Sequence, residues 1–144
     1  MARVTTYLNF PGNTEEAFLF YRAVFGTEFV TPIKRFKDAP SEPGDPSMPP
    51  ELANGVMHVS LPILGGHVLM GTDAPEVMGF KLIPGNNVYI NLEPDSRAEA
   101  ERLFQALAEE GSIESPLQEM FWGAYWGTLT DRFGIHWMFN CPTS

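Results

Sequence analysis

Two histidines and one glutamate are the side chains in this chain best suited to acid–base or metal chemistry: His58, His136 and Glu119. Imidazole exchanges protons near neutral pH and binds metals, and a carboxylate can serve as a base or a ligand. Each residue also has a structural interpretation, because strand histidines are commonly held by hydrogen bonds and a lone glutamate beside aromatic residues is commonly structural. His58, His136 and Glu119 are therefore candidate catalytic residues, and a structural role is the leading interpretation of each.

The charge balance limits the partners. The 144 residues include 18 Asp and Glu against 9 Lys and Arg, giving a net charge of -9. Phosphate backbones and anionic membrane surfaces would repel such a chain, so we expect no nucleic-acid partner and no membrane partner. The sequence has no apolar run of membrane-spanning length and no leader pattern, and Cys141 is its only cysteine. These features favour a cytoplasmic location.

The sequence contains a duplication, because Tyr7–Pro11 (YLNFP) resembles Tyr89–Pro94 (YINLEP). The duplication predicts the elements that carry the candidate residues. Each stretch precedes apolar residues spaced i, i+3, i+4, i+7 and i+8, which is typical of a helix buried on one side. These residues are Ala17, Phe20, Tyr21, Val24 and Phe25 in the first copy, and Ala100, Leu103, Phe104, Leu107 and Ala108 in the second. The predicted N-cap and terminating glycine are Asn13 and Gly26 in the first, and Ser96 and Gly111 in the second.

Strands are predicted before and after each helix, which gives two β-α-β-β-β modules, residues 1–73 and 86–144. Together the modules form one predicted α+β domain. The predicted strands are 3–10, 27–36, 55–64 and 67–72 in the first module, and 87–92, 112–121, 124–130 and 135–141 in the second. Gly65-Gly66 and Asp131–Gly134 predict the turns between strands. The proline-rich segment Lys37–Asn54 has no counterpart in the second module. It is predicted to be a lid, a dimer arm, or a disordered insertion without a role.

Modules of this kind resemble the vicinal oxygen chelate superfamily, which includes glyoxalase I, bleomycin-resistance proteins and extradiol dioxygenases. The runs Gln118–Gly123 (QEMFWG) and Thr130–Met138 (TDRFGIHWM) are similar to its PhnB-like, or 3-demethylubiquinone 3-methyltransferase-like, branch. The opening Tyr7–Phe10, and Phe20-Tyr21 followed by Phe25-Gly26, fit the same branch. The resemblance implies the glyoxalase/bleomycin resistance/dioxygenase fold: eight strands in a curved mixed sheet, a cup that holds ligands, and a homodimer.

The resemblance also indicates where a metal would bind. In metal-dependent members of the superfamily, the first and last strands of each module supply His, Glu or Gln ligands. Aligning the strands carries these positions to Thr5, Met70, Asn87 and Met138. A hydroxyl, an amide and two thioethers are poor ligands for zinc or iron. We therefore expect the usual metal centre to be absent and no cofactor to be bound.

Strand alternation divides the side chains between two faces. The large apolar set is expected to pack against the helices: Val4, Leu8, Phe10, Leu69, Val88, Ile90, Leu92, Ile135, Trp137 and Phe139. The opposite set is mixed and is expected to line the cup: Tyr7, Asn9, His58, Ser60, Val68, Met70, Thr72, Tyr89, Asn91, Trp126, Thr128, His136, Met138 and Asn140. Trp122 is expected to form an aromatic wall with Trp126. Such a lining suits a small, partly aromatic or amphipathic molecule.

Three functional hypotheses follow. The first is a metal-free, homodimeric protein that binds a small molecule in the cup. The second is a lyase, isomerase or dioxygenase that uses a relocated metal or acid–base catalysis at His58, His136 or Glu119. The third is a structural or regulatory dimer without a small ligand. Typical S-adenosylmethionine methyl transfer is disfavoured, because Pro11-Gly12-Asn13 is not the glycine-rich turn that follows the first strand of a Rossmann fold.

Overall fold

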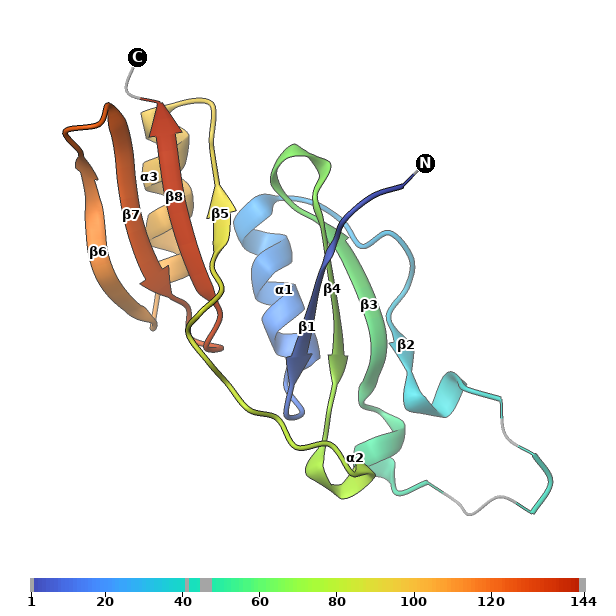
Figure 1. The fold of residues 1–144 in the computed structure, drawn as a ribbon. Coiled ribbons are helices and arrows are strands. Elements are labelled where there is room, and N and C mark those ends of the chain that lie inside the picture. The colour runs from blue at the N-terminus through green and yellow to red at the C-terminus, as the bar shows by residue number, and fades with distance from the viewer. Residues whose placement is uncertain (1, 41, 45–47, 143–144) are drawn as a thin grey trace. The chain divides into compact units, whose positions relative to one another are not determined.

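The chain forms two compact units, Met1–Leu82 and Ile83–Ser144. The computed structural model describes residues 2–40, 42–44 and 48–142 (Figure 1). The boundary between the units falls between the two predicted modules. No helix in the described ranges is long and apolar enough to span a membrane.

The first unit is a four-stranded mixed sheet with one long helix on one face (Figure 1). Its elements are β1 (Thr6–Phe10), α1 (Thr14–Phe25), β2 (Lys34–Arg35), α2 (Pro50–Ala53), β3 (Val56–Pro62) and β4 (Val68–Asp73). The strand order is β1-β4-β3-β2, and only the β1–β4 pair is parallel. The helix α1 packs on β3 and β4.

The second unit repeats this topology. Its elements are β5 (Ile90–Leu92), α3 (Arg97–Ala108), β6 (Ser112–Glu119), β7 (Ala124–Thr130) and β8 (His136–Pro142). The order β5-β8-β7-β6 matches that of the first unit, again with one parallel pair, β5–β8. The equivalent strands β3 and β7 also share the same sequence of buried and half-buried positions. The predicted duplication and the α+β class with eight strands are confirmed.

Most of the residues predicted to face the helices are buried or half-buried, but the two that precede the first strand of each unit are not. The buried members are Leu8, Phe10, Leu69, Leu92, Trp137 and Phe139, while Ile90 and Ile135 are half-buried. The prediction was wrong for Val4 and Val88, which are 85% and 72% exposed. The physical reason is that the two strands begin later than predicted, at Thr6 and Ile90, so the valines precede the sheets.

The predicted helix face is confirmed for α3 except at Ala108, which is half-buried, and is confirmed only partly for α1. In α3 the buried residues are Ala100, Leu103, Phe104 and Leu107. In α1 they are Thr14, Ala17, Phe18, Tyr21 and Val24, so Phe18 replaces the predicted Phe20 and Phe25, which are half-buried. Phe18 fits because β4 carries Gly71 beneath it: a Cβ at Gly71 would lie 2.5 Å from Phe18 Cε1.

The strand predicted at 27–36 was wrong except at its end, where β2 spans two residues. The preceding segment attaches to β3 by isolated hydrogen bonds. Thr27 Oγ1 donates to Pro62 O over 2.6 Å, and Val30 N donates to Ser60 O over 3.0 Å. Pro32 has no N–H to donate, which interrupts a ladder at this point.

The ends of the long helices also differ between the copies. Ser96 caps α3 as predicted, accepting a hydrogen bond from Glu99 N over 3.1 Å, and Gly26 ends α1 in the left-handed conformation. Asn13 makes no side-chain cap bond. The prediction for Gly111 was also wrong, because Glu110 is the left-handed residue after α3, with φ of 59°.

The insertion Lys37–Asn54 contains short helical segments where it is described. A 3-10 turn spans Phe36–Asp38, and α2 spans Pro50–Ala53. Residues 41 and 45–47 of the insertion lie outside the described residues. The predicted glycine turn after β3 is confirmed, because Gly65 and Gly66 both have positive φ.

Candidate functional site

In each unit the sheet face opposite the helix carries the residues predicted for the cup. In the first unit, pairing aligns Tyr7, Met70 and Ser60 across β1, β4 and β3. In the second unit it aligns three others in the same way: Asn91, Met138 and Thr128. Of the residues predicted for the cup, Ser60, Val68 and Thr128 are buried, and the others are exposed or half-buried. Each unit therefore gathers polar and soft apolar side chains on one uncovered face.

A tyrosine–histidine pair lies on this face in both units. The ring centroids of Tyr7 and His58 are 5.9 Å apart, and Tyr7 OH lies 3.4 Å from His58 Nδ1. The ring centroids of Tyr89 and His136 are 5.3 Å apart. The sequence alignment pairs Tyr7 with Tyr89, but this pairing was wrong by two residues, because Tyr7 pairs with Met70 whereas Asn91 pairs with the equivalent Met138. His58 lies on β3 and His136 on β8. The two copies thus form a similar pair from different strands.

His136 belongs to a longer hydrogen-bonded group. Its Nε2 lies 2.7 Å from Gly85 O, and its Nδ1 lies 2.8 Å from Thr130 Oγ1. A carbonyl oxygen only accepts, so Nε2 carries the hydrogen. Thr130 Oγ1 lies 3.4 Å from Glu114 Oε1, and Tyr89 OH donates to Glu114 Oε2 over 3.0 Å, which raises the pKa of Tyr89.

Thr130 and Glu114 were not predicted as site residues. Thr130 lies two residues after Thr128 on β7, so it shares the uncovered face of that strand. Glu114 lies on the neighbouring β6, where Ser112 pairs with Thr130. Extending the alternation by one position on β7 and by one strand would have identified both residues.

Glu119 lies at the opposite end of the second sheet from His136. Glu119 pairs with Tyr125 at one end of β7, and His136 pairs with Thr130 at the other. Five residues of strand separate these positions by roughly 17 Å. Glu119 is exposed and accepts a hydrogen bond from Arg97 over 2.7 Å. It therefore cannot act together with His136 within this unit. His58 belongs to the other unit, and a cavity shared by the two histidines stays a prediction.

The residues at the expected metal positions do not fit a zinc or iron centre. Thr5 Oγ1 donates to Met70 Sδ over 3.9 Å, so the first two positions contact each other. Asn87 is exposed and precedes β5, and Met138 is half-buried in β8. Thioether and neutral oxygen groups are a poor set for these cations. Within the described residues, no three His, Cys, Asp or Glu side chains cluster as metal ligands.

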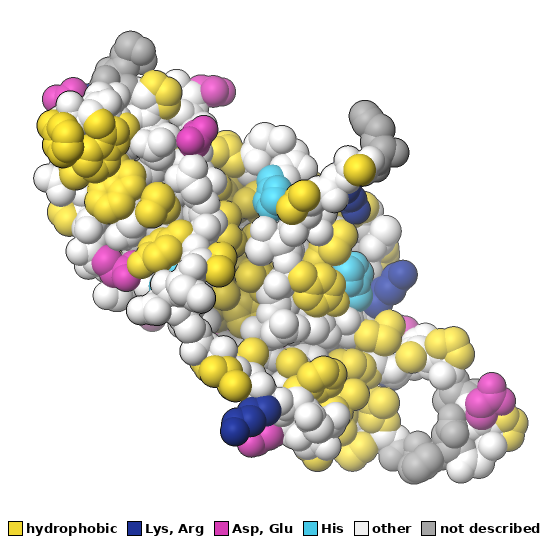
Figure 2. Space-filling view, in the orientation of Figure 1, with side chains coloured by type: hydrophobic (Ala, Val, Ile, Leu, Met, Phe, Trp, Pro, Cys, Tyr) yellow, Lys and Arg dark blue, Asp and Glu magenta, His cyan; other side chains and the backbone are white. Residues whose placement is uncertain are grey.

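An exposed aromatic cluster follows β6. Phe121 is 97% exposed and Trp122 is 52% exposed. The ring centroid of Trp122 lies 5.1 Å from that of Phe121 and 6.1 Å from that of Trp126, both with edge-to-face geometry. Figure 2 shows hydrophobic side chains gathered over the connection between β6 and β7, which contains Phe121 and Trp122. The two tryptophans predicted as a wall are thus neighbours.

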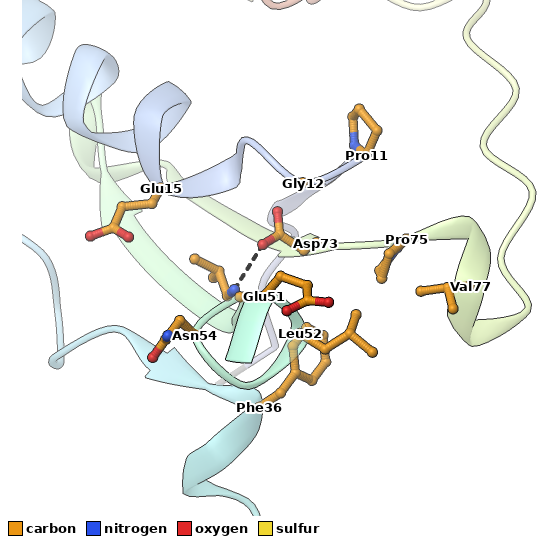
Figure 3. Close-up of a pocket in the computed structure, with 12 residues that line it drawn as sticks. Pro11, Gly12, Glu15, Phe36, Glu51, Leu52, Asn54, Asp73, Pro75 and Val77 are labelled. Carbon is orange, nitrogen blue, oxygen red and sulfur yellow. Dashed lines mark hydrogen bonds between the residues drawn. The ribbon is translucent and has the colours of Figure 1, made fainter. Parts of the chain in front are cut away.

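A pocket of about 380 Å³ lies at the end of β4 in the first unit (Figure 3). Its apolar lining includes Phe36, Leu52 and Val77. The buried carboxylate of Asp73 lines it and accepts hydrogen bonds from Thr14 N and Val56 N. At its edge Glu15 accepts two hydrogen bonds from the guanidinium of Arg35, each 2.9 Å, and this contact lowers the pKa of Glu15. Two of its three carboxylates are therefore engaged within the protein.

A pocket of about 510 Å³ lies at the equivalent end of β8 in the second unit. Four residues of each pocket correspond when the strands are aligned by their register: Pro11 with Asp95, Asn54 with Trp122, Gly55 with Gly123, and Val56 with Ala124. Both pockets lie where a parallel pair of strands ends, β1–β4 or β5–β8. Sequence reasoning missed them, because they are formed by the connections after the strands.

Comparison with known proteins agrees with this architecture. Protein YjdN of Escherichia coli K12 is 30% identical over 146 residues, covering 95% of this chain and 93% of YjdN. The crystal structure of protein PA1353 of Pseudomonas aeruginosa has a TM-score of 0.83 and 37% identity, covering 99% of this chain and 98% of that one. The PhnB protein of Bacillus cereus has a TM-score of 0.68 and 28% identity, with coverages of 97% and 99%.

The fold extends to more distant proteins. A glyoxalase/bleomycin resistance protein/dioxygenase family enzyme of Burkholderia phytofirmans has a TM-score of 0.62 at 18% identity, covering 95% of this chain and 97% of that one. The family model described as 3-demethylubiquinone-9 3-methyltransferase matches residues 2–139. The chain therefore belongs to this 3-demethylubiquinone-9 3-methyltransferase family, and it shares the fold of the glyoxalase/bleomycin resistance protein/dioxygenase family enzyme.

Proposed function

We propose that this protein binds a small, partly aromatic or amphipathic molecule on the uncovered faces of its sheets without using a metal ion. The observation that carries the proposal is the tyrosine–histidine pair present on that face in both units. Tyrosine and histidine offer a flat apolar ring together with hydrogen-bonding groups, and nearby Met70 and Met138 can adapt their shape to a ligand.

The name of the family mentions methyl transfer, but the local chemistry of this chain supports binding better. A typical S-adenosylmethionine enzyme holds its cofactor at a glycine-rich turn after the first strand of a doubly wound sheet. Here β1 leads through Pro11-Gly12-Asn13 into α1, and each unit has a small mixed sheet. We therefore propose no typical methyltransferase site.

The binding proposal is tested with neutral planar aromatics such as quinoline, indole and benzamide, using NMR shifts of Tyr, His and Trp signals. We expect Tyr7→Leu and Tyr89→Leu to weaken binding at least about fivefold, because each removes a ring from the face. Phe80→Leu is the matched control, since Phe80 is as exposed as Tyr7, 49%, but lies after β4 and outside the sheet. Equal weakening in all three variants, or no binding by any probe, would contradict the proposal.

Acid–base catalysis at His136 is the second candidate function. It is favoured by the 2.8 Å contact between His136 Nδ1 and the hydroxyl of Thr130. In this arrangement Nδ1 would take a proton from an acidic carbon through the Thr130 hydroxyl.

The catalytic proposal is tested by solvent deuterium exchange beside the carbonyl of small ketones and 2-oxo acids. Exchange should be lost in His136→Gln and reduced in Thr130→Val. It should persist in His67→Gln, because His67 lies in the turn between β3 and β4 of the first unit and bonds to Thr6. No exchange above the buffer rate with any probe would contradict this second function.

A homodimer and a cytoplasmic location complete the proposal. Exposed apolar side chains such as Val30, Ile83 and Phe121 offer surface for a second copy. Light scattering after size-exclusion chromatography should give twice the 16.0 kDa chain mass, and a monomer at micromolar concentration would contradict the dimer. The acidic composition and the lone Cys141 favour the cytoplasm, which fractionation of cells expressing the protein tests.

A further inference from the structure

We propose that the pocket at the ends of β5 and β8 binds a small organic cation bearing N–H donors, such as an alkylammonium or guanidinium group. Trp122 would supply an aromatic wall, and Glu93 and Asp95 would supply the charge. The inference rests on the proposed small-molecule function and adds a ligand class, organic cations, and a binding site, this pocket of the second unit. The chain's net charge of -9 would also attract such a ligand over long range.

Two carboxylates line this pocket directly after β5. Glu93 accepts a hydrogen bond from Asn91 Nδ2 over 3.3 Å, which orients its carboxylate beside the uncovered face. Asp95 follows two residues later and lines the same pocket. The neighbouring cation, Arg97, is already engaged: it donates to Glu119 over 2.7 Å and lies 4.7 Å from the ring centroid of Tyr125. The charge that the pocket presents is therefore negative.

A buried acceptor in the same pocket lacks a donor. The side-chain oxygen Oδ1 of Asn140 is buried, and no group in the part of the chain that the structure describes donates to it. Asn140 lies in β8 opposite Trp126 and lines the pocket. A buried acceptor without a donor is costly, so this oxygen favours a ligand that brings an N–H group. Ammonium and guanidinium groups offer several such donors.

Trp122 selects an organic cation over a hydrated metal ion. It lines the pocket and keeps about half of its surface exposed, 52%, while its neighbours Phe121 and Trp126 contact it edge to face. The face of an indole ring attracts a poorly hydrated cation. Calcium and magnesium instead take oxygen ligands only and gain nothing from the indole ring.

The first unit provides an internal comparison. At the positions equivalent to Asp95 and Trp122, its pocket has Pro11 and Asn54. Its Glu15 is paired with Arg35, and its Asp73 accepts two backbone hydrogen bonds. The same place in the fold therefore lacks both the aromatic wall and the carboxylate of Asp95, so we expect the cation to bind in the second unit only.

The test uses the full chain and follows the three indole N–H signals by NMR while n-butylammonium or guanidinium chloride is added. The signals of Trp122 and Trp126 should shift with saturation, whereas that of Trp137 should not, because Trp137 is buried and donates to Asp131. The neutral analogue n-butanol should bind at least about tenfold more weakly, since it lacks the charge. An unchanged Trp137 signal in each variant also shows that the second unit remains folded.

Three variants locate the site. Trp122→Leu should weaken n-butylammonium binding at least about fivefold, because it removes the aromatic face. The double variant Glu93→Gln with Asp95→Asn should weaken it about tenfold at low salt and remove most of its salt dependence. Glu76→Gln with Glu51→Asn, which removes the same charge from the first unit, is the matched control and should leave binding within about twofold, since neither residue lines this pocket.

Several outcomes would overturn the inference: equal binding of n-butanol, equal weakening by the control pair, or saturable calcium binding that excludes n-butylammonium. Absence of any saturable shift would overturn it as well. The proposed function fails separately. If neutral aromatics bind through Tyr7 and Tyr89 while the cations do not, the function stands and this inference is wrong. If only the cations bind, the inference stands and the aromatic ligand class is wrong.

Discussion

Asp73 is the last residue of β4, Cys141 is its equivalent near the end of β8, and both are buried, but only Asp73 bonds to the start of a helix and of a neighbouring strand. Asp73 Oδ1 accepts a hydrogen bond from Thr14 N over 3.0 Å, and Oδ2 accepts one from Val56 N over 2.8 Å. The thiol of Cys141 instead donates to Pro94 O over 3.3 Å. The first copy thus caps its helix from the sheet, and the second caps its helix locally with Ser96.

Replacing Asp73 should therefore cost more than replacing Cys141. Asp73→Ala leaves two buried backbone N–H groups without acceptors, and we expect a loss of about 2–4 kcal/mol in the free energy of unfolding. Cys141→Ala removes one weak donor and a small side chain and should cost about 1 kcal/mol. Urea denaturation monitored by circular dichroism measures both. A similar loss in the two variants would show that Asp73 does not carry the cap.

The glycine after α3 should be needed for close packing and not for helix termination. A Cβ at Gly111 would lie 2.4 Å from Thr130 O, so Gly111→Ala should destabilise by about 1–3 kcal/mol. Glu110→Gly should stabilise by about 0.5–1 kcal/mol, because Glu110 occupies the left-handed region and its ion pair with Arg132 is exposed. Thermal denaturation separates the two effects, with Gly12→Ala as a neutral control. A stabilising Gly111→Ala would refute this assignment.

The spacing of apolar residues predicted the features of the fold that depend on local sequence, namely the main strands and helices. The duplicated strand–helix pattern at Tyr7 and Tyr89 identified both sheets and the face that carries the tyrosines. It could not predict that Phe18 would replace Phe20 in the core, because that choice depends on the space above Gly71, a residue distant in the sequence. The capping role of Asp73 escaped prediction for the same reason, since its partners lie 59 and 17 residues away.

The candidate site was predicted by residue type more than by geometry. Alternation placed Tyr7 and His58 on one face, but it could not show that Glu119 is held by Arg97 at the far end of the sheet from His136. That separation is set by strand register, which depends on tertiary pairing. The paired pockets at the strand ends escaped prediction because loops carry no periodic pattern.

The contact between Arg35 and Glu15 predicts a small acid-dependent loss of stability. Hydrogen bonding to Arg35 lowers the pKa of Glu15 below its ordinary value of 4.5. A lowered pKa in the folded state contributes stability that is present above pH 4.5 and is lost as the pH falls through the lowered value. The effect should be small, because Glu15 is partly exposed.

Arg35→Gln tests this prediction directly, because it removes the charge that holds the Glu15 carboxylate. NMR titration should show the pKa of Glu15 rising towards 4.5, while the pKa of Glu99, which Arg102 lowers in α3, should not change. An unchanged Glu15 titration in Arg35→Gln would show that the ion pair does not form in solution.

The imidazole of His136 should be held as the tautomer with hydrogen on Nε2 whenever it is neutral. Gly85 O lies 2.7 Å from Nε2 and can only accept, which leaves Nδ1 to accept from the hydroxyl of Thr130. Long-range nitrogen–proton NMR spectra at alkaline pH distinguish the two tautomers. Thr130→Val removes the Nδ1 partner but leaves the carbonyl, so the Nε2–H tautomer should persist. If Nδ1–H dominates in the unmodified protein, the contact with Gly85 is absent, and Thr130 would no longer be positioned to donate to His136 during proton transfer.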